Sequence, residues 1–311
     1  MKKVLIIIIC VLLAAIVAVV SFLGGIGYYS YVAIAETVSA PEVKEDGSLV
    51  IMSANIRRRE KVINFNKMDQ GSCRWYKRAK YYLKNIEVVA PDILGAQEVQ
   101  KGQYEFLTEH LKGYASVVGY RDDRGARAES CPIFYNEARF ECLDSGTFWL
   151  SDTPDVMSKF DGADEYRIAT FVTLKDKVTG TTIAVYNTHP DWTGVEGRIK
   201  QLAVVAAKAK ANTADAVVIL GDLNSDRTLQ GGNAGLSSIE TDFLKDSKTF
   251  EGMTDYGATF NGYAIDPEAP MALDYIFLPK ETTVLDVGKV DTVYGGIYPS
   301  DHYPIWAEVK F

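Results

Sequence analysis

Histidine, cysteine and positive charge are scarce in this sequence of 311 residues. Four cysteines are too few for a disulfide-stabilised scaffold, and none is spaced from a histidine as in a zinc site. Acidic residues outnumber basic ones by 41 to 33, and the net charge of −8 argues against a tight, non-specific binder of polyanions. The hydrophobic content of 47% and the charged content of 24% are typical of a globular protein.

Charged residues are missing altogether from residues 4–35, which follow Lys2 and Lys3. The apolar run from Val4 to Leu23 supplies the ~20 residues that a helix needs to cross a bilayer. The two lysines should stay on the cytoplasmic side. We therefore predict that residues 1–35 form an uncleaved signal anchor. This single transmembrane helix would hold the rest of the chain on the outer face of the cell membrane.

Cleavage of the leader is the alternative. Val38-Ser39-Ala40 is an acceptable cleavage site, although Pro41 directly after it is unfavourable. Cleavage there would give a secreted protein instead of an anchored one.

Short apolar runs alternate with segments of helical period after residue 47. Residues 36–47 are polar and predict a short stalk, and residues 48–311 have no internal linker and predict one domain. Many strands with few helices favour two packed sheets with helices outside, an α/β sandwich. Predicted strands are 49–55, 93–97, 115–119, 132–135, 140–143, 168–174, 182–187, 216–220, 273–278 and 303–310. Predicted helices are 74–89, 102–111, 195–211 and 237–244.

Cys131 and Cys142 flank a predicted β-hairpin whose turn is Asn136-Glu137. In an oxidising compartment the two thiols would lie opposite each other and could form a cross-strand disulfide. Buried free thiols are the simpler alternative, and the one we favour.

Six polar clusters interrupt the apolar runs, each at the end of a predicted strand. Each alone has a simple explanation as a turn, but together they offer oxygen donors suited to a hard cation such as Mg²⁺. They also contain two of the three histidines; the third, His110, lies on a predicted helix and is expected at the surface. The clusters are Ser53-Ala54-Asn55, Gln97-Glu98, Asn187-Thr188-His189-Pro190-Asp191, Gly221-Asp222-Leu223-Asn224, Leu273-Asp274-Tyr275 and Ser300-Asp301-His302.

In this order the clusters resemble the endonuclease/exonuclease/phosphatase superfamily, and the resemblance runs from about Leu49 to Phe311. Three further segments, 132–135, 146–151 and 167–170, are similar to a bacterial branch of it. The resemblance implies a four-layer α/β sandwich, two packed and mostly antiparallel sheets flanked by helices, with its site along one rim. It also implies a Mg²⁺-dependent phosphoester hydrolase, with Mn²⁺ as the alternative ion.

The resemblance further assigns a metal site. Glu98 matches the principal metal ligand of the family. Asn55 and Asp301 match residues in or beside the coordination shell. A metal held there would neutralise charge on a phosphate, which phosphoryl hydrolysis requires.

Five residues receive catalytic roles by the same resemblance. Asp222 positions or deprotonates the attacking water, and Asn224 steadies the phosphate and the metal. His189 donates to a non-bridging phosphate oxygen. His302 pairs with Asp274, which fixes the imidazole tautomer and favours its charged form. Whether Asp222 or His302 takes the proton of the water is left open.

Substrate contacts are suggested by residues beside these clusters. Arg167 and the basic run Arg57 to Arg59 are candidates for phosphate contact, and Trp192 could stack on a base or contact a lipid or a sugar. Trp192 could equally pack against its own loop, and Glu129 could orient a ligand or be a solvated loop charge. The next predicted helix carries further basic residues that could join this run over the site: Arg74, Lys77, Arg78 and Lys80. An ordinary solvated helix face explains these four just as well.

The sequence therefore predicts a phosphodiesterase or phosphatase, with a membrane-anchored extracellular nuclease as the nearest alternative. A catalytically inactive surface binding protein is the alternative of another class, and the intact set of polar residues argues against it. Nucleic acid, phospholipid and sugar phosphate all stay open as substrates.

Overall fold

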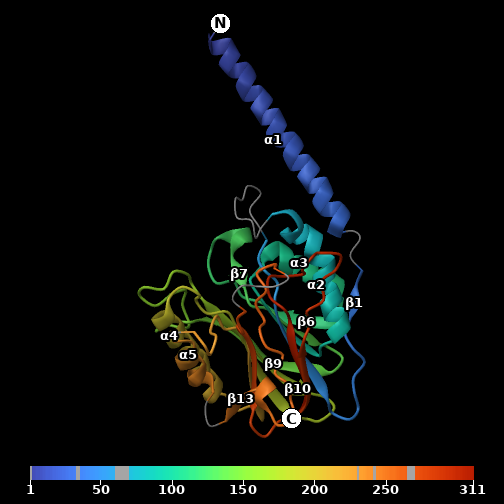
Figure 1. Ribbon diagram of the computed structural model, residues 1–311, viewed down its shortest axis with the longest axis vertical. Coiled ribbons are helices and arrows are strands. Elements are labelled where there is room, and N and C mark those ends of the chain that lie inside the picture. The colour runs from blue at the N-terminus through green and yellow to red at the C-terminus, as the bar shows by residue number, and fades with distance from the viewer. Residues whose placement is uncertain (1, 33–35, 60–69, 230, 241–242, 265–269) are drawn as a thin grey trace.

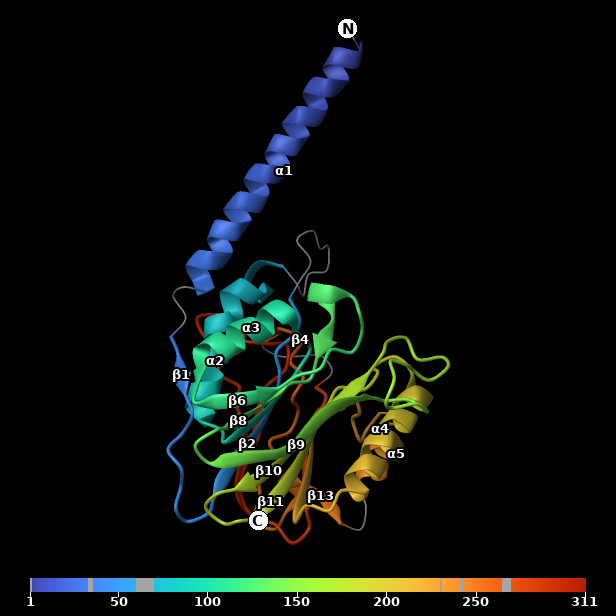
Figure 2. The same cartoon turned by 180° about the vertical axis from the view of Figure 1, so that it is seen from behind.

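Two six-stranded β-sheets occupy the centre of the computed structural model (Figures 1 and 2). The structure describes residues 2–32, 36–59, 70–229, 231–240, 243–264 and 270–311, and within the first helix the side chains of residues 6 and 8–22. The helices are α1 (Lys2–Val32), α2 (Trp75–Val89), α3 (Lys101–His110), α4 (Val195–Lys210) and α5 (Gly232–Ile239).

The two sheets are named after one central strand of each. The β2 sheet has the order β15 (Thr283–Lys289), β16 (Ile305–Lys310), β2 (Leu49–Asn55), β3 (Ile93–Gln97), β8 (Ile133–Asn136) and β6 (Tyr114–Val117). The β12 sheet has the order β13 (Leu244–Asp246), β14 (Asp274–Pro279), β12 (Ala216–Asp222), β11 (Thr182–Thr188), β10 (Ile168–Asp176) and β9 (Phe140–Trp149). Two short pairs join β1 (Val38–Ser39) to β5 (Leu111–Lys112) and β4 (Val99–Gln100) to β7 (Glu129–Ser130).

Four layers follow from where the apolar side chains pack. Ile51 of the β2 sheet and Val218 of the β12 sheet belong to one cluster between the sheets. Tyr82 of α2 packs with the outer face of the β2 sheet, while Leu202 of α4 and Leu236 of α5 pack with the outer face of the β12 sheet. Figure 2 shows α2 and α3 on one side of the sheets and α4 and α5 on the other. The predicted α/β class is confirmed, and each sheet is mixed.

The sheets come unusually close beneath one rim. A Cβ atom on Gly95 of β3 would lie 2.1 Å from Leu220 Cδ1 of β12, so only glycine fits there. Beside it the Gln97 amide donates across the gap to Asn187 Oδ1 at 2.8 Å, and Asn187 in turn donates to the carbonyl of Ala96. Buried amides that satisfy one another fix the register of the two sheets at this point. These two predicted polar residues therefore support the rim from below.

The predicted hairpin between residues 132 and 143 is wrong. β8 pairs with β3 and β6, whereas β9 pairs with β10 in the other sheet, so the chain changes sheet at the expected turn. Cys131 is buried and Cys142 exposed, and both are free thiols. Burial raises the pKa of the Cys131 thiol to about 12, which makes it unreactive at neutral pH.

Two other expectations differ from the structure. Helix α5 begins at Gly232 and ends at Ile239, earlier than the predicted 237–244, of which residues 241 and 242 lie outside the described residues. The glycines at the start of α5 make this helix hard to recognise in the sequence. Glycine suits the packing at residue 235, since a Cβ there would lie 2.9 Å from Leu202 of α4. His110 is buried rather than exposed, with its Nδ1 bonded to the Phe106 carbonyl.

The described side chains of α1 are all exposed. Within the part of the chain that the structure describes, no helix combines the length and apolarity that crossing a membrane requires. The predicted span from Val4 to Leu23 includes side chains outside the described residues.

Candidate active site

The directions of six strands bring the polar clusters to one rim. In each sheet the central pair is parallel, β2 with β3 and β11 with β12, so the carboxyl ends of each pair lie together. Their antiparallel neighbours β16 and β14 begin at the same end. Residues that follow four strands and precede two others therefore meet, although they are up to about 250 positions apart in sequence.

The Asp222 carboxylate lies at the centre of this group. Its Oδ2 accepts a hydrogen bond from Asn55 Nδ2 at 2.9 Å, and it lies 3.4 Å from His189 Nε2 and 3.5 Å from His302 Nε2. Its Oδ1 accepts from the backbone N–H of Asn224 at 3.0 Å. Burial raises the pKa of Asp222, and the neighbouring histidines oppose that rise. The structure thus assembles a buried carboxylate with a histidine on each side.

His302 is held by Asp274. Its Nδ1 lies 2.8 Å from Asp274 Oδ2, and its ring meets Phe260 edge-on. Burial alone would lower the pKa of His302, but the charges of Asp274 and Asp222 outweigh it and raise that pKa to about 10. The ring is therefore an imidazolium at neutral pH, with Nδ1–H donating to Asp274.

His189 is in the opposite state. Burial and the nearby Arg167 guanidinium lower its pKa to about 4, so it is neutral at pH 7. Arg167 Nη1 lies 3.3 Å from His189 Nδ1, which places the imidazole proton on Nε2, facing Asp222. Asp191, fully buried, lies 3.8 Å from Arg167 and accepts from the backbone N–H of Asp164. Arg167 and Asp191 thus orient His189 from behind.

A second group of carboxylates surrounds Arg57. Arg57 Nη1 lies 3.4 Å from Asp301 Oδ2 and 4.0 Å from Glu98 Oε2, and Glu98 Oε1 is 3.4 Å from Asn55 Nδ2. Although burial opposes it, the charges of Arg57, His189 and Arg58 hold the pKa of Glu98 well below its usual range. A positive group thus already lies beside the carboxylates of Glu98 and Asp301, as a divalent cation would.

These donors fit the predicted metal. Glu98 and Asp301 supply the hard oxygen atoms that Mg²⁺ and Mn²⁺ prefer, and Asn55 lies beside them with its Oδ1 accepting from the backbone N–H of Arg57. In the described part of the chain, Asp222, Asp274 and His302 form a further buried group whose ligand atoms lie within 4.8 Å of one another and could hold a metal. The ion itself is not identified by either group.

Backbone conformation is strained at the same rim. Arg57, Glu98 and Asn224 have φ angles of 54°, 60° and 48°, in the left-handed region that residues other than glycine rarely adopt. Each follows within two residues the last position of β2, β3 or β12. Such strain persists only where the surroundings determine it, and it concentrates at functional sites.

Arg78 of α2 holds the strained loop after β2. It is fully buried and donates to the carbonyls of Cys73, Ile56, Arg57, Arg58 and Pro299, which uses all of its donors. Pro299 precedes Asp301 by two residues, so one guanidinium ties together the loops beside two of the three predicted metal ligands, Asn55 and Asp301. The alternative that Arg78 belongs to a solvated helix face is wrong.

We expect Arg78→Lys to impair both folding stability and metal use. Lysine has three donors on one atom and cannot replace a planar five-donor fork. Each carbonyl left buried and unpaired should cost about 1–3 kcal/mol. Thermal unfolding should show a lower Tm, and a Mg²⁺ titration of activity should show a raised half-saturating concentration. Lys84→Ala, on the exposed side of the same helix, is the control. An unchanged Mg²⁺ titration would show that Arg78 does not position the ligand loops.

The remaining predicted substrate residues lie around this centre. Trp192 is 69% exposed, so it does not pack against its loop. Glu129 is buried rather than solvated, and its two oxygens lie 3.1 Å from Arg58 Nη1 and 2.9 Å from Arg121 Nη1. Arg121, which sequence reasoning missed, is 4% exposed.

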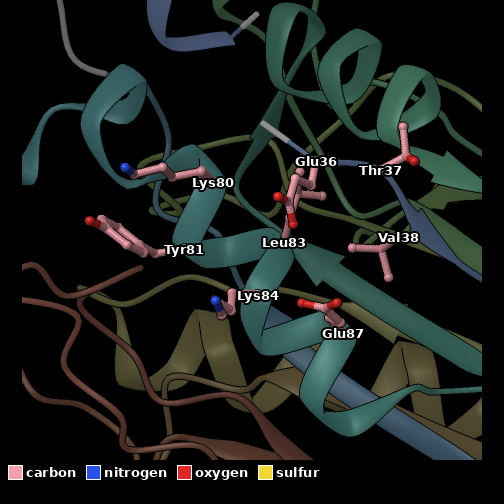
Figure 3. Close-up of a pocket in the computed structure, with 8 residues that line it drawn as sticks. All are labelled: Glu36, Thr37, Val38, Lys80, Tyr81, Leu83, Lys84 and Glu87. Atoms are coloured by element: carbon pink, nitrogen blue, oxygen red, sulfur yellow. The ribbon is translucent and has the colours of Figure 1, made fainter. Parts of the chain in front are cut away.

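A small cavity adjoins the site, and a larger one lies elsewhere. The small one, about 10 Å³, lies against Glu98 and His189. The larger one, about 260 Å³, lies between the segment that enters β1 and helix α2 (Figure 3). The residues that line it are Glu36, Thr37, Val38, Lys80, Tyr81, Leu83, Lys84 and Glu87, and none of them belongs to the rim.

Comparison with known proteins points to one family. The sequence model of the Endonuclease/Exonuclease/phosphatase family matches residues 52–302. A 3'-5'-exoribonuclease subunit of the CCR4-Not complex from Mycosarcoma maydis is 23% identical in an alignment of 306 positions that covers 75% of this chain and 46% of that protein. The chain spans less than half the length of this relative and of the protein angel from Drosophila melanogaster.

Solved structures match over nearly their whole length. An endonuclease/exonuclease/phosphatase family protein from Bacteroides thetaiotaomicron is 30% identical with a TM-score of 0.73, covering 84% of this chain and 97% of that one. A mannosyl-6-phosphatase from the same species is 29% identical with a TM-score of 0.71, covering 85% and 100%.

Proposed function

Because this chain belongs to the endonuclease/exonuclease/phosphatase family, we propose that it is a Mg²⁺-dependent phosphoester hydrolase, either a phosphodiesterase or a phosphatase. The observation that carries the proposal is the Asp222 carboxylate, which lies between a neutral and a charged histidine and within reach of Asn55. A protein that only binds its ligand would not require two histidines in opposite charge states beside one carboxylate. Fold alone would not support the activity.

Asp222 is the proposed base. His302 is already protonated at neutral pH and cannot accept a proton there, whereas the Asp222 carboxylate can. His302 donates instead, to the oxyanion or the leaving oxygen, with Asp274 fixing the ring. His189 donates from Nε2 to a non-bridging phosphate oxygen, and Asn224, whose amide donates to the Pro190 carbonyl, is the proposed second contact of the phosphate.

Glu98, Asp301 and Asn55 are the residues that would hold the metal. A bound Mg²⁺ supplies charge neutralisation at the phosphate. Arg57 carries a positive charge between the same carboxylates and is the proposed phosphate contact, with Arg167 acting through His189 rather than directly.

Assay of the full chain on a substrate panel tests this proposal. DNA, RNA, phospholipids and sugar phosphates are each incubated with Mg²⁺, Mn²⁺ or EDTA, and phosphate release and chain cleavage are measured. Metal-dependent hydrolysis of at least one substrate is expected. No hydrolysis of any of them by folded protein would favour the inactive binding protein.

A nuclease is the second candidate, since a curated relative is an exoribonuclease subunit. The exposed ring of Trp192 offers a surface on which a base could stack. Cleavage of RNA or DNA in the panel, with little release from small phosphomonoesters, would favour it.

Glu98→Gln should weaken Mg²⁺ dependence of activity without unfolding the protein. The amide keeps the shape of the side chain but removes the charge that a hard cation needs. A Mg²⁺ titration should show a raised half-saturating concentration and lower turnover. Glu105→Gln, exposed on α3, is the matched control. An unaltered titration would remove Glu98 from the proposed ligands.

We also propose that residues 1–35 anchor the chain in the cell membrane with residues 48–311 outside. Support comes from the uncharged run after Lys2 and Lys3, and from the exposed apolar side chains of α1, among them Phe22. A periplasmic-type reporter fused after Phe311 should be active and a cytoplasmic reporter inactive. The reverse result would overturn the orientation, and a reporter recovered free in the medium would favour cleavage.

A further inference from the structure

The small cavity beside the rim has no role in the chemistry described so far. With about 10 Å³ open to the centre of a water-sized probe, it has room for about one such group. Two of its lining residues, Glu98 and His189, belong to the proposed site, so a group inside it would be attached to a substrate at the phosphate. Its other polar walls come from Arg121, Glu129 and Arg167.

The polar atoms of the walls select what can enter. Arg167 is 5% exposed, and its Nε has no hydrogen-bond partner among the described residues, so it calls for an acceptor. The Glu129 carboxylate, also buried, is paired with Arg58 and Arg121, and its remaining lone pairs can accept one more hydrogen bond from a donor in the cavity. A hydroxyl group is both donor and acceptor, and it is the size of a water molecule.

Charged groups fit the cavity poorly. An anion, such as an oxygen of a second phosphate, would lie against the carboxylates of Glu98 and Glu129. A cation would lie against the buried guanidinium groups of Arg121 and Arg167. Each would bring a like charge into a desolvated space, which costs far more than placing a neutral hydroxyl there.

We propose that this cavity is a subsite for a hydroxyl group next to the scissile phosphoester, and that the substrate is a phosphate ester of a small polyol, the class to which sugar phosphates belong. The proposal rests on the hydrolase activity proposed above. Glu129 and Arg167 hold the hydroxyl, and Arg58 and Arg121 hold Glu129 in place.

The test compares two substrates that differ in hydroxyl groups alone. Glycerol 3-phosphate has a hydroxyl beside its phosphoester, and n-propyl phosphate has none on the same carbon chain. A site built to bond a hydroxyl rejects the analogue that lacks it by large factors, and we expect kcat/KM to favour glycerol 3-phosphate at least ~100-fold.

Glu129→Gln should reduce this preference toward one, because the amide offers one acceptor oxygen in place of two and no charge. Glu165→Gln is the matched control: Glu165 also contacts Arg121, at 3.3 Å, but does not line the cavity, and its loss should leave the preference intact. Circular dichroism reports folding. The comparison of the two substrates uses only the wild-type protein, so it tests the subsite even if Glu129→Gln does not fold.

Three results would overturn the subsite. Equal kcat/KM for the two esters would do so while leaving the hydrolase activity established. Faster cleavage of an oligoribonucleotide than of glycerol 3-phosphate would assign the hydroxyl to a ribose in a nucleic acid instead. Absence of activity on every phosphoester of the panel would remove the proposed function and the subsite together.

Discussion

Asp222→Asn should reduce kcat by about 10²–10⁴-fold, the range that a positioned proton acceptor contributes. The amide cannot take a proton from water, and its NH₂ would face the Asn55 amide, which now donates to Asp222 Oδ2 at 2.9 Å. Steady-state kinetics on whichever ester the panel identifies provides the measurement. KM should change far less than kcat, because the carboxylate acts on the water rather than on the ester.

Stability separates this effect from damage to the fold. Burial raises the pKa of Asp222, so the neutral amide relieves a cost of the ionised carboxylate, whereas its NH₂ facing the Asn55 amide opposes that gain, and Tm should change little. Asp215→Asn, before the start of the same strand and exposed, should leave kcat unchanged and lower Tm only slightly, through weaker hydrogen bonds to Thr182. Near-wild-type turnover in Asp222→Asn would exclude Asp222 as the base and return that role to a different group.

The strands that position the site could be predicted from sequence because they are apolar throughout. β2 and β3 occur at the predicted residues, 49–55 and 93–97, and both are fully buried. Polar residues at the ends of such buried strands lie at the rim of the sheet, which is why Asn55 and Glu98 could be predicted as site residues. Their meeting with Asp222 could not be worked out from periodicity, and it came from the resemblance.

The pairing of strands that are distant in the chain could not be predicted from the sequence. Alternating residues on either side of Asn136-Glu137 suit a hairpin equally well whether the two strands pair or join different sheets. The chain takes the second course, since β8 finds its partners in β3 and β6. The residues of a turn do not indicate which strands the two flanking segments will pair with.

The burial of Arg78 could be predicted from its position on the helix. The buried residues of α2 include Trp75, Ala79, Tyr82 and Ile86, whose spacing of three and four marks one helix face, and Arg78 lies on it. A charge at such a position has to be paired with several acceptors. His110 gives the same signal, three residues after Leu107 on the buried face of α3. For both residues, the position on the helix predicts burial better than the charge of the side chain does.

The His302–Asp274 pair should govern the pH dependence of kcat. If the imidazolium is the donor, kcat should fall as pH rises through the pKa of His302, about 10. Asp274→Asn removes the charge that contributes most to raising this pKa, so the alkaline fall should move to lower pH, and kcat at neutral pH should drop by about 10²-fold or more. A pH profile of kcat for both proteins measures the shift.

The double variant tells whether the two residues act as a unit. Adding His302→Ala to Asp274→Asn should cost little more than either change alone, because members of one catalytic unit are not additive. His189→Ala, by contrast, removes a separate donor at a cost of about 10²–10³-fold. Because both histidines lie beside Asp222 Oδ2, its effect should be less than multiplicative with that of Asp274→Asn.

Stability has to be followed across the same pH range. A histidine whose pKa is raised on folding stabilises the protein fully below its unfolded pKa of about 6.5, and that contribution is lost as pH rises toward 10. The alkaline fall of kcat is therefore read only where circular dichroism shows the protein folded. Full activity of His302→Ala at neutral pH, or an alkaline limb that Asp274→Asn leaves in place, would show that the imidazolium is not the donor. In that case the pair would serve to hold Asp222 in its strained rim, where both histidines lie within 3.5 Å of its Oδ2.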